Sequence, residues 1–158
     1  MSPIFRKLTD VRHALLRLHK ALLDDQRIMY EKAHGVVTPA EFLQLIINEP
    51  SFDWLHRLSE LVVQIDEQME DTENILTAES AKVLLDQAKT LLTPSETGEG
   101  FARGYFEAIQ RNPEIAMTQG EIRKLISAPL AAVHQDGVDL GSASEVLMVA
   151  TEGRTAEP

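Results

Sequence analysis

The sequence predicts an all-α fold: an up-and-down four-helix bundle with short extra helices and a flexible C-terminal tail. Apolar residues recur at intervals of three and four over long segments, and helix-ending and helix-starting signals separate those segments. No segment alternates with period two for long enough to indicate a strand. At 158 residues and 44% hydrophobic content, the chain suits a single domain with a substantial core. We expect a helical bundle domain over residues 1–126 and a mostly disordered acidic tail over 127–158.

The first long helix is predicted over residues 9–33. Its apolar positions alternate threes and fours: Leu8, Val11, Leu15, Leu18, Leu22 and Met29. Gly35 follows and can adopt the left-handed conformation of a C-terminal cap. Thr38 and Glu41 then form a capping box with Pro39 at the first helical position, which predicts a short helix that stops near Pro50.

The second long helix is predicted over residues 51–71, SFDWLHRLSELVVQIDEQMED. Its apolar face is formed by Trp54, Leu58, Leu61, Ile65 and Met69. This spacing predicts that Trp54, the only tryptophan, is mostly buried. It also predicts that His56 and Glu60, four residues apart, project mostly to solvent.

Three further helical segments are predicted after this helix. One runs from about Thr77 to Leu92, and the Thr-Pro-Ser-Glu stretch at 93–96 then repeats the start signal of a helix that settles after Gly100. Asn112 and Pro113 end that helix. Thr118 with Glu121 predicts a cap for one short last segment through Ile126.

Charge and composition exclude several classes of function. The net charge of −10 disfavours binding to phosphate backbones, so no nucleic-acid partner is expected. No apolar run approaches the length of a membrane span, and the absence of cysteine excludes disulfides and thiolate nucleophiles. Residues 1–34 carry seven Lys/Arg against four Asp/Glu, which fits a first helix beside acidic neighbours or a basic amphipathic arm. We expect a cytoplasmic protein with no membrane contact.

No catalytic residue, metal site or cofactor is predicted from the motifs. Glu31 and His34 form one Glu-x-x-His pair, whereas metal-binding bundles use two such pairs and two further glutamates. A histidine in the last turn of a helix also complements the helix dipole. The glycines of GEGFARG, residues 98–104, follow a helix and lack the P-loop lysine, so they indicate flexibility at a helix start and close helix contact.

Four polar residues lie at the edges of the predicted apolar stripes: His19 and Asp25 on the first helix, and Ser59 and Asp66 on the second. Such positions fall where packed helices meet, so they favour partial burial and shifted pKa values. They form either a hydrogen-bonded network that fixes the register of the helices or a ligand-binding site between them.

The run EFLQLIINEPSFDWLHRLSELVVQIDE (residues 41–67), followed by LLDQAKTLL and YFEAIQRNPEIAM, resembles a family of small uncharacterised bacterial proteins, a domain of unknown function. Its members share a leucine-rich segment, a Trp-Leu-x-x-Leu-Ser helix ending in Asp-Glu, and a final aromatic helix. The resemblance covers about residues 8–126 and implies a helical bacterial protein without assigning a catalytic residue. At the position of His56, members often carry arginine.

These observations favour a non-enzymatic interaction or regulatory protein over an enzyme. Its partner is expected to be another protein or a second copy of the chain, as in a homodimer, bound through an exposed helix face or through the apolar stretch at 145–150 of the tail. The alternative is a small-ligand or metal-binding bundle centred on His19, Asp25, Ser59 and Asp66.

Overall fold

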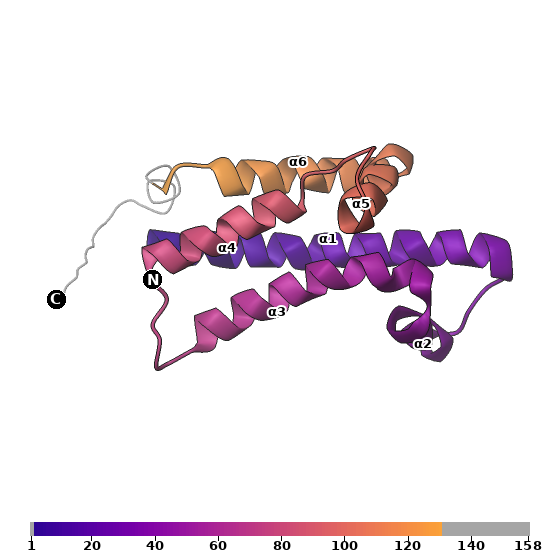
Figure 1. Cartoon of the computed structure of the whole chain (residues 1–158), viewed down its shortest axis with the longest axis horizontal. Helices are drawn as coiled ribbons and strands as arrows, with labels where there is room; N and C mark the ends of the chain where they lie inside the picture. Colours follow the sequence, from indigo (N-terminus) through magenta and orange to yellow (C-terminus); the bar gives the residue numbers. More distant parts are fainter. Residues whose placement is uncertain (1, 131–158) are drawn as a thin grey trace. The chain divides into compact units, whose positions relative to one another are not determined.

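A computed structural model describes residues 2–130 and shows an all-α protein, as predicted (Figure 1). This part of the chain contains six α-helices, one 3-10 helix and no strand. The elements are α1 (Pro3–His34), α2 (Pro39–Asn48), η1 (Pro50–Leu55), α3 (His56–Glu70), α4 (Ala78–Leu91), α5 (Gly100–Arg111) and α6 (Pro113–Ser127). Most of the predicted tail, including the apolar stretch at 145–150, lies outside the described residues.

The chain divides into two compact units. The larger contains Thr9–Ile126 and therefore the greater part of every helix. Of the smaller unit, the structure describes residues 2–8 and 127–130. There the Lys7 ammonium donates a 2.6 Å hydrogen bond to the carbonyl of Ala128, and burial lowers the pKa of Lys7.

The predicted caps around α1 and α2 are confirmed. Gly35 has φ +89° and its N–H bonds to the Glu31 carbonyl at 2.8 Å, which ends α1 in the left-handed conformation. The Thr38 hydroxyl accepts from the N–H of Glu41 at 3.2 Å, and the Glu41 carboxylate accepts from the N–H of Thr38 at 2.8 Å. This reciprocal pair is the capping box, and Pro39 occupies the first turn of α2.

The predicted helix over residues 51–71 is divided into η1 and α3. A 3-10 helix repeats every three residues, so Phe52 and Leu55 share its inner face, and both are buried. Trp54 is not fully buried, but its ring packs against Phe101 with centroids 5.4 Å apart, which agrees with the prediction of a mostly buried indole. The prediction for His56 is wrong, because its side chain is half-buried and bonds to α2. Glu60 is exposed as predicted.

The start of α5 agrees with the prediction of a helix that settles at Gly100, whereas the start of α6 differs from the predicted one. The Thr-Pro-Ser-Glu stretch precedes α5 without starting it, and the helix begins at Gly100 with φ +60°. α6 begins directly after Asn112, whose side-chain oxygen accepts from the N–H of Glu114 at 3.0 Å. Thr118 lies inside α6 and donates to the Glu114 carbonyl, so it caps no helix.

The core of the larger unit lies between the long helices, where α3 and α4 run alongside α1 (Figure 1). Among its fully buried side chains are Leu15, Leu18, Leu22, Leu58, Ile65, Leu84, Tyr105, Ile115 and Ile122. The inward spacing predicted for α1 and α3 is confirmed by these positions, and Trp54 and Met69 are partly buried. The exception is Met29 near the end of α1, which is 39% exposed.

Candidate functional site

Asp25 joins α1 to the junction of α5 and α6. Its side chain is only 10% exposed. One carboxylate oxygen accepts a hydrogen bond from Arg111 Nε at 2.8 Å and lies 2.6 Å from Arg111 Nη2 in an ion pair. The Asn112 amide donates to its other oxygen at 3.4 Å. A carboxylate held by a two-nitrogen guanidinium contact and an amide is strongly positioned. Asp25 thus contributes to holding the helices together.

Asp66 joins α3 to α1 in a similar way. Arg12 Nε bonds to one oxygen of Asp66, and Arg12 Nη2 donates to the other at 3.4 Å. The hydrogen bond to Asp66 raises the pKa of Arg12. Both side chains are about a third exposed, so this pair lies at the edge of the helix contact.

His19 on α1 and Ser59 on α3 are both partly buried. The Ser59 hydroxyl donates to the carbonyl of His56 at 2.9 Å, within its own helix. Burial lowers the pKa of His19, and the charge of His56 lowers it further. Asp25, Ser59 and Asp66 therefore engage different partners, and the structure shows no hydrogen bond or ion pair between any two of the four predicted residues.

Metal ligands do not gather in the part of the chain that the structure describes. Over residues 2–130, no group of three or more His, Asp or Glu side chains is placed to hold a metal ion. Glu31 accepts from the N–H of Val37 at 2.9 Å, and His34 bonds to the carbonyl of Tyr30 at 3.1 Å. The Glu-x-x-His pair thus acts locally, at the end of α1.

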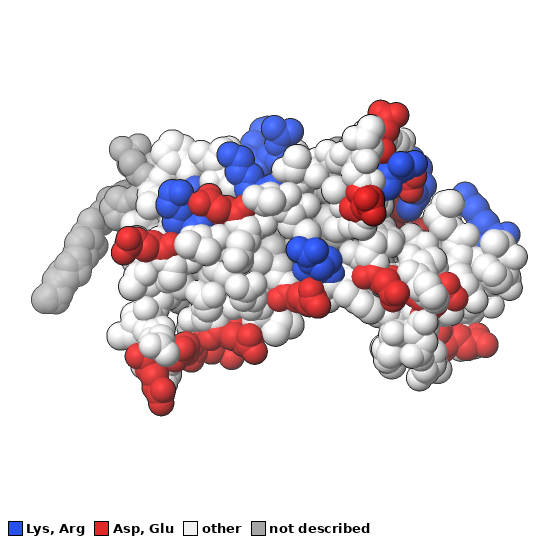
Figure 2. All heavy atoms as spheres, viewed as in Figure 1, with Lys and Arg blue, Asp and Glu red and all other residues white. Residues whose placement is uncertain are grey.

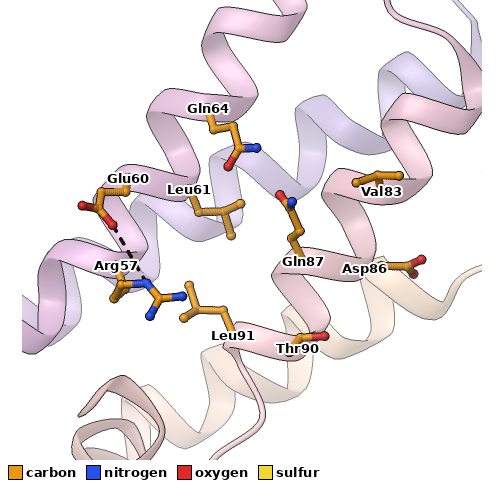
Figure 3. Close-up of a pocket in the computed structure, with 9 residues that line it drawn as sticks. All are labelled: Arg57, Glu60, Leu61, Gln64, Val83, Asp86, Gln87, Thr90 and Leu91. Carbon is orange, nitrogen blue, oxygen red and sulfur yellow. Dashed lines mark ion pairs between the residues drawn. The ribbon is translucent and has the colours of Figure 1, made fainter.

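A groove of about 550 Å³ runs between α3 and α4 (Figure 3). Gln64 and Gln87 point into it from opposite helices, with Leu61 and Leu91 beneath them. Arg57 and Glu60 at its rim form an ion pair of 3.9 Å, and both side chains are about 70% exposed. The groove is lined by amides, by positively and negatively charged groups and by aliphatic side chains, so its lining does not indicate one class of ligand.

The helix α2 presents an apolar surface. None of its ten residues is fully buried, although it is the most apolar by composition of the α-helices that the structure describes. Leu43 and Ile47, one turn apart, are 56% and 57% exposed. A ten-residue helix is marginal on its own in water, so α2 depends on contacts made by its other face. The sequence signal for this surface is the short apolar run FLQLII, which by itself predicts a helix and not its exposure.

The inner face of α2 is attached by a small set of contacts. The guanidinium of Arg27 lies 5.0 Å from the centre of the Phe42 ring, and the Phe42 and Phe52 rings meet edge-on at 6.1 Å. His56 Nε2 donates to the carbonyl of Ile46 at 2.9 Å. Because a carbonyl only accepts, Nε2 of His56 carries a proton.

Tyr105 and Gln119 form a polar pair inside the core. The Tyr105 hydroxyl donates to the Gln119 side-chain carbonyl, and the Gln119 amide donates to the Leu92 carbonyl at 3.2 Å. Tyr105 is fully buried and Gln119 is 8% exposed. Burial raises the pKa of the Tyr105 phenol, so it stays protonated and acts as a donor. This pair ties α5 and α6 to the end of α4.

We predict that Tyr105→Phe lowers the free energy of unfolding by about 1 to 3 kcal/mol, because a buried acceptor on Gln119 loses its donor. Urea denaturation measures the loss. Tyr30→Phe is the matched control, since Tyr30 makes ring contacts with His34 and Phe52 that the change preserves. Equal stability of the two variants would contradict a role for the Tyr105 hydroxyl.

Comparisons with known proteins found no match: no protein-family model, curated protein or solved structure is significantly similar to the chain. Of the helices described, none combines the length and the apolar character needed to cross a membrane.

Proposed function

We propose that the protein is a non-enzymatic interaction protein of the bacterial cytoplasm, which binds a basic amphipathic helix of a partner through the α2 surface formed by Leu43 and Ile47. The observation that carries the proposal is a ten-residue apolar helix without one buried residue. Exposed apolar residues grouped on one helix face are typical of docking surfaces. We also propose that the helices form an up-and-down four-helix bundle with short extra helices, and that the chain belongs to the bacterial family that the sequence resembles.

Charge selects the partner. Within residues 38–49 the only charged residues are Glu41 and Glu49, and the whole chain carries −10. The one cation described against α2, Arg27, is paired with Glu31. In Figure 2 the surface around α2 is mainly uncharged, with acidic atoms beside it. A helix that pairs apolar residues at intervals of three or four with Lys or Arg matches both features. A second copy of this acidic chain matches only the apolar one.

The alternative, a small-ligand or metal-binding bundle, has less support. Asp25 and Asp66, two of its four proposed ligands, each hold an arginine. Binding of a cation there would require breaking these ion pairs.

The test uses two synthetic helical peptides with leucine at intervals of three and four, one with lysine and one with glutamate at the other positions. We predict that the protein binds the lysine peptide and that the double change Leu43→Gln and Ile47→Gln weakens binding at least tenfold. Burial of two half-exposed aliphatic side chains contributes about 2 kcal/mol. Fluorescence anisotropy of the labelled peptide measures this.

Met117→Gln is the matched control, because Met117 is 69% exposed on another helix, α6. It should leave binding unchanged. If the variant with both α2 changes still binds the lysine peptide as tightly as the wild type, the proposal is contradicted. Such binding would depend only on attraction between the basic peptide and the acidic protein. Light scattering could instead show a dimer that the Leu43 and Ile47 changes dissociate. In that case the partner of the α2 surface would be a second copy of the chain and not a basic helix.

A further inference from the structure

One apolar stripe runs along the outer side of α2 from its first turn to its last. Ala40, Leu43 and Ile47 recur at intervals of three and four residues, and all three are exposed. The inner side of the helix carries Phe42, whose ring meets that of Phe52 edge-on. Because the stripe begins in the first turn of α2, it adjoins the linker that enters the helix.

This linker, residues 35–38, is held by hydrogen bonds to its backbone (Figure 1). The N–H of Val37 donates to the carboxylate of Glu31 at 2.9 Å, and Arg27 Nη2 donates to the carbonyl of Val37 at 3.4 Å. Both partners lie on α1, and the capping box described above fixes the residue that follows. The linker is therefore ordered without any contribution from the side chain of Val36.

Val36 is presented to solvent in the middle of this ordered linker. It is 89% exposed, more than any other large apolar residue within residues 2–130. Its neighbour Val37 is only partly exposed, and the backbone of Val37 bonds to α1. An apolar side chain on a fixed backbone loses little further entropy when a partner covers it, so Val36 is well suited to be a binding contact.

We propose that Val36 is the third contact of the α2 surface, and that the partner helix extends past the first turn of α2 to cover it. The contact rests on the proposed function, because it belongs to the same surface. It also sets the length of the partner. The 10 residues of α2 span about 15 Å, and the chain from Val36 to Pro39 adds up to about 10 Å. A partner helix that covers both has about 14 to 17 residues, or about four to five turns.

Fluorescence anisotropy of a labelled lysine peptide of about 18 residues, with the pattern described above, tests the contact in the full chain. Val36→Gln should weaken binding about five- to tenfold, the loss expected when one aliphatic contact is removed. Val36→Ile keeps an apolar branched side chain and should bind like the wild type. Because Val36 is exposed, neither change should alter the thermal midpoint of unfolding.

A second peptide tests the length of the partner. A lysine peptide of about 11 residues, held helical by a side-chain staple, covers α2 alone. The Leu43 and Ile47 changes should weaken its binding, and Val36→Gln should not. Equal weakening of both peptides by Val36→Gln would show that the change disturbs α2, and would overturn a direct contact.

Ile75→Gln is the matched control, because Ile75 is 79% exposed in the loop between α3 and α4, and it should leave binding unchanged. Val36→Gln could leave binding of the long peptide unchanged while the Leu43 and Ile47 changes weaken it. That result would overturn the role of Val36 and leave the proposed function standing. Absence of binding of either lysine peptide to the wild type would overturn both proposals.

Discussion

Gly104→Ala should lower the free energy of unfolding by about 1 to 3 kcal/mol, as extra atoms do in a packed core. A Cβ atom at Gly104 would lie 2.5 Å from Cδ2 and 2.7 Å from Cε3 of Trp54, and an indole ring cannot bend away from it. The Trp54 ring is itself held against Phe101, with centroids 5.4 Å apart. Either α5 or η1 must therefore shift. Thermal and urea unfolding measure the loss.

Gly120→Ala is the matched control on α6. A Cβ atom at Gly120 would meet no neighbouring atom within 4 Å, so the change adds only the helix propensity of alanine and should raise stability by up to about 1 kcal/mol. The sole tryptophan supplies a second readout, since only the Gly104 change should shift its emission. Equal stability of the two variants would show that the α5–η1 contact gives way without cost.

Asp25→Ala should cost about 2 to 3 kcal/mol of unfolding free energy. The change leaves the Arg111 guanidinium without its carboxylate and the Asn112 amide without its acceptor. Removing one partner of a fully buried pair costs about 3 to 5 kcal/mol. The Arg111 side chain is 30% exposed, so water recovers part of that cost.

Asp24→Ala tests whether any carboxylate at this part of α1 matters. Asp24 pairs with Lys20 at 2.8 Å in an exposed contact within the helix, and its loss should change stability by less than about 0.5 kcal/mol. A double-mutant cycle of Asp25→Ala with Arg111→Ala should give a coupling above about 1 kcal/mol. A coupling near zero would mean that Asp25 acts through packing alone.

Local signals account for the parts of the fold that could be predicted. The ends of α1 and α2 follow from Gly35 and Thr38, whose backbone and side-chain preferences act within a few residues. The misplaced boundaries come from competing local signals. Asn112 and Pro113 both end α5 and start α6, and the sequence pattern predicts only the end. Thr118 and Glu121 imitate a capping box in the middle of a helix.

The candidate site was less predictable because its partners are distant in sequence. Helix periodicity places Asp25 and Asp66 at helix contacts, and both do join helices. Periodicity could not show that Arg111 and Arg12 meet them, since this depends on how the helices pack. The bond from His56 to Ile46 escapes prediction for another reason. A period of 3.6 applied through residue 54 rotates His56 outward, whereas the 3-10 turn of η1 brings it to α2.

The Asp25–Arg111 ion pair cannot form during synthesis until Arg111 has been added to the chain. The two residues are 86 positions apart, and synthesis proceeds at about 5 to 20 residues per second. Arg111 is therefore synthesised roughly 4 to 17 s after Asp25. Arg12 and Asp66 are also separated in time, by the synthesis of 54 residues. During that interval the apolar stripe of the nascent α1 has no final partner from α5 or α6. Chaperones that bind amphipathic helices have their longest access to this chain at its first helix.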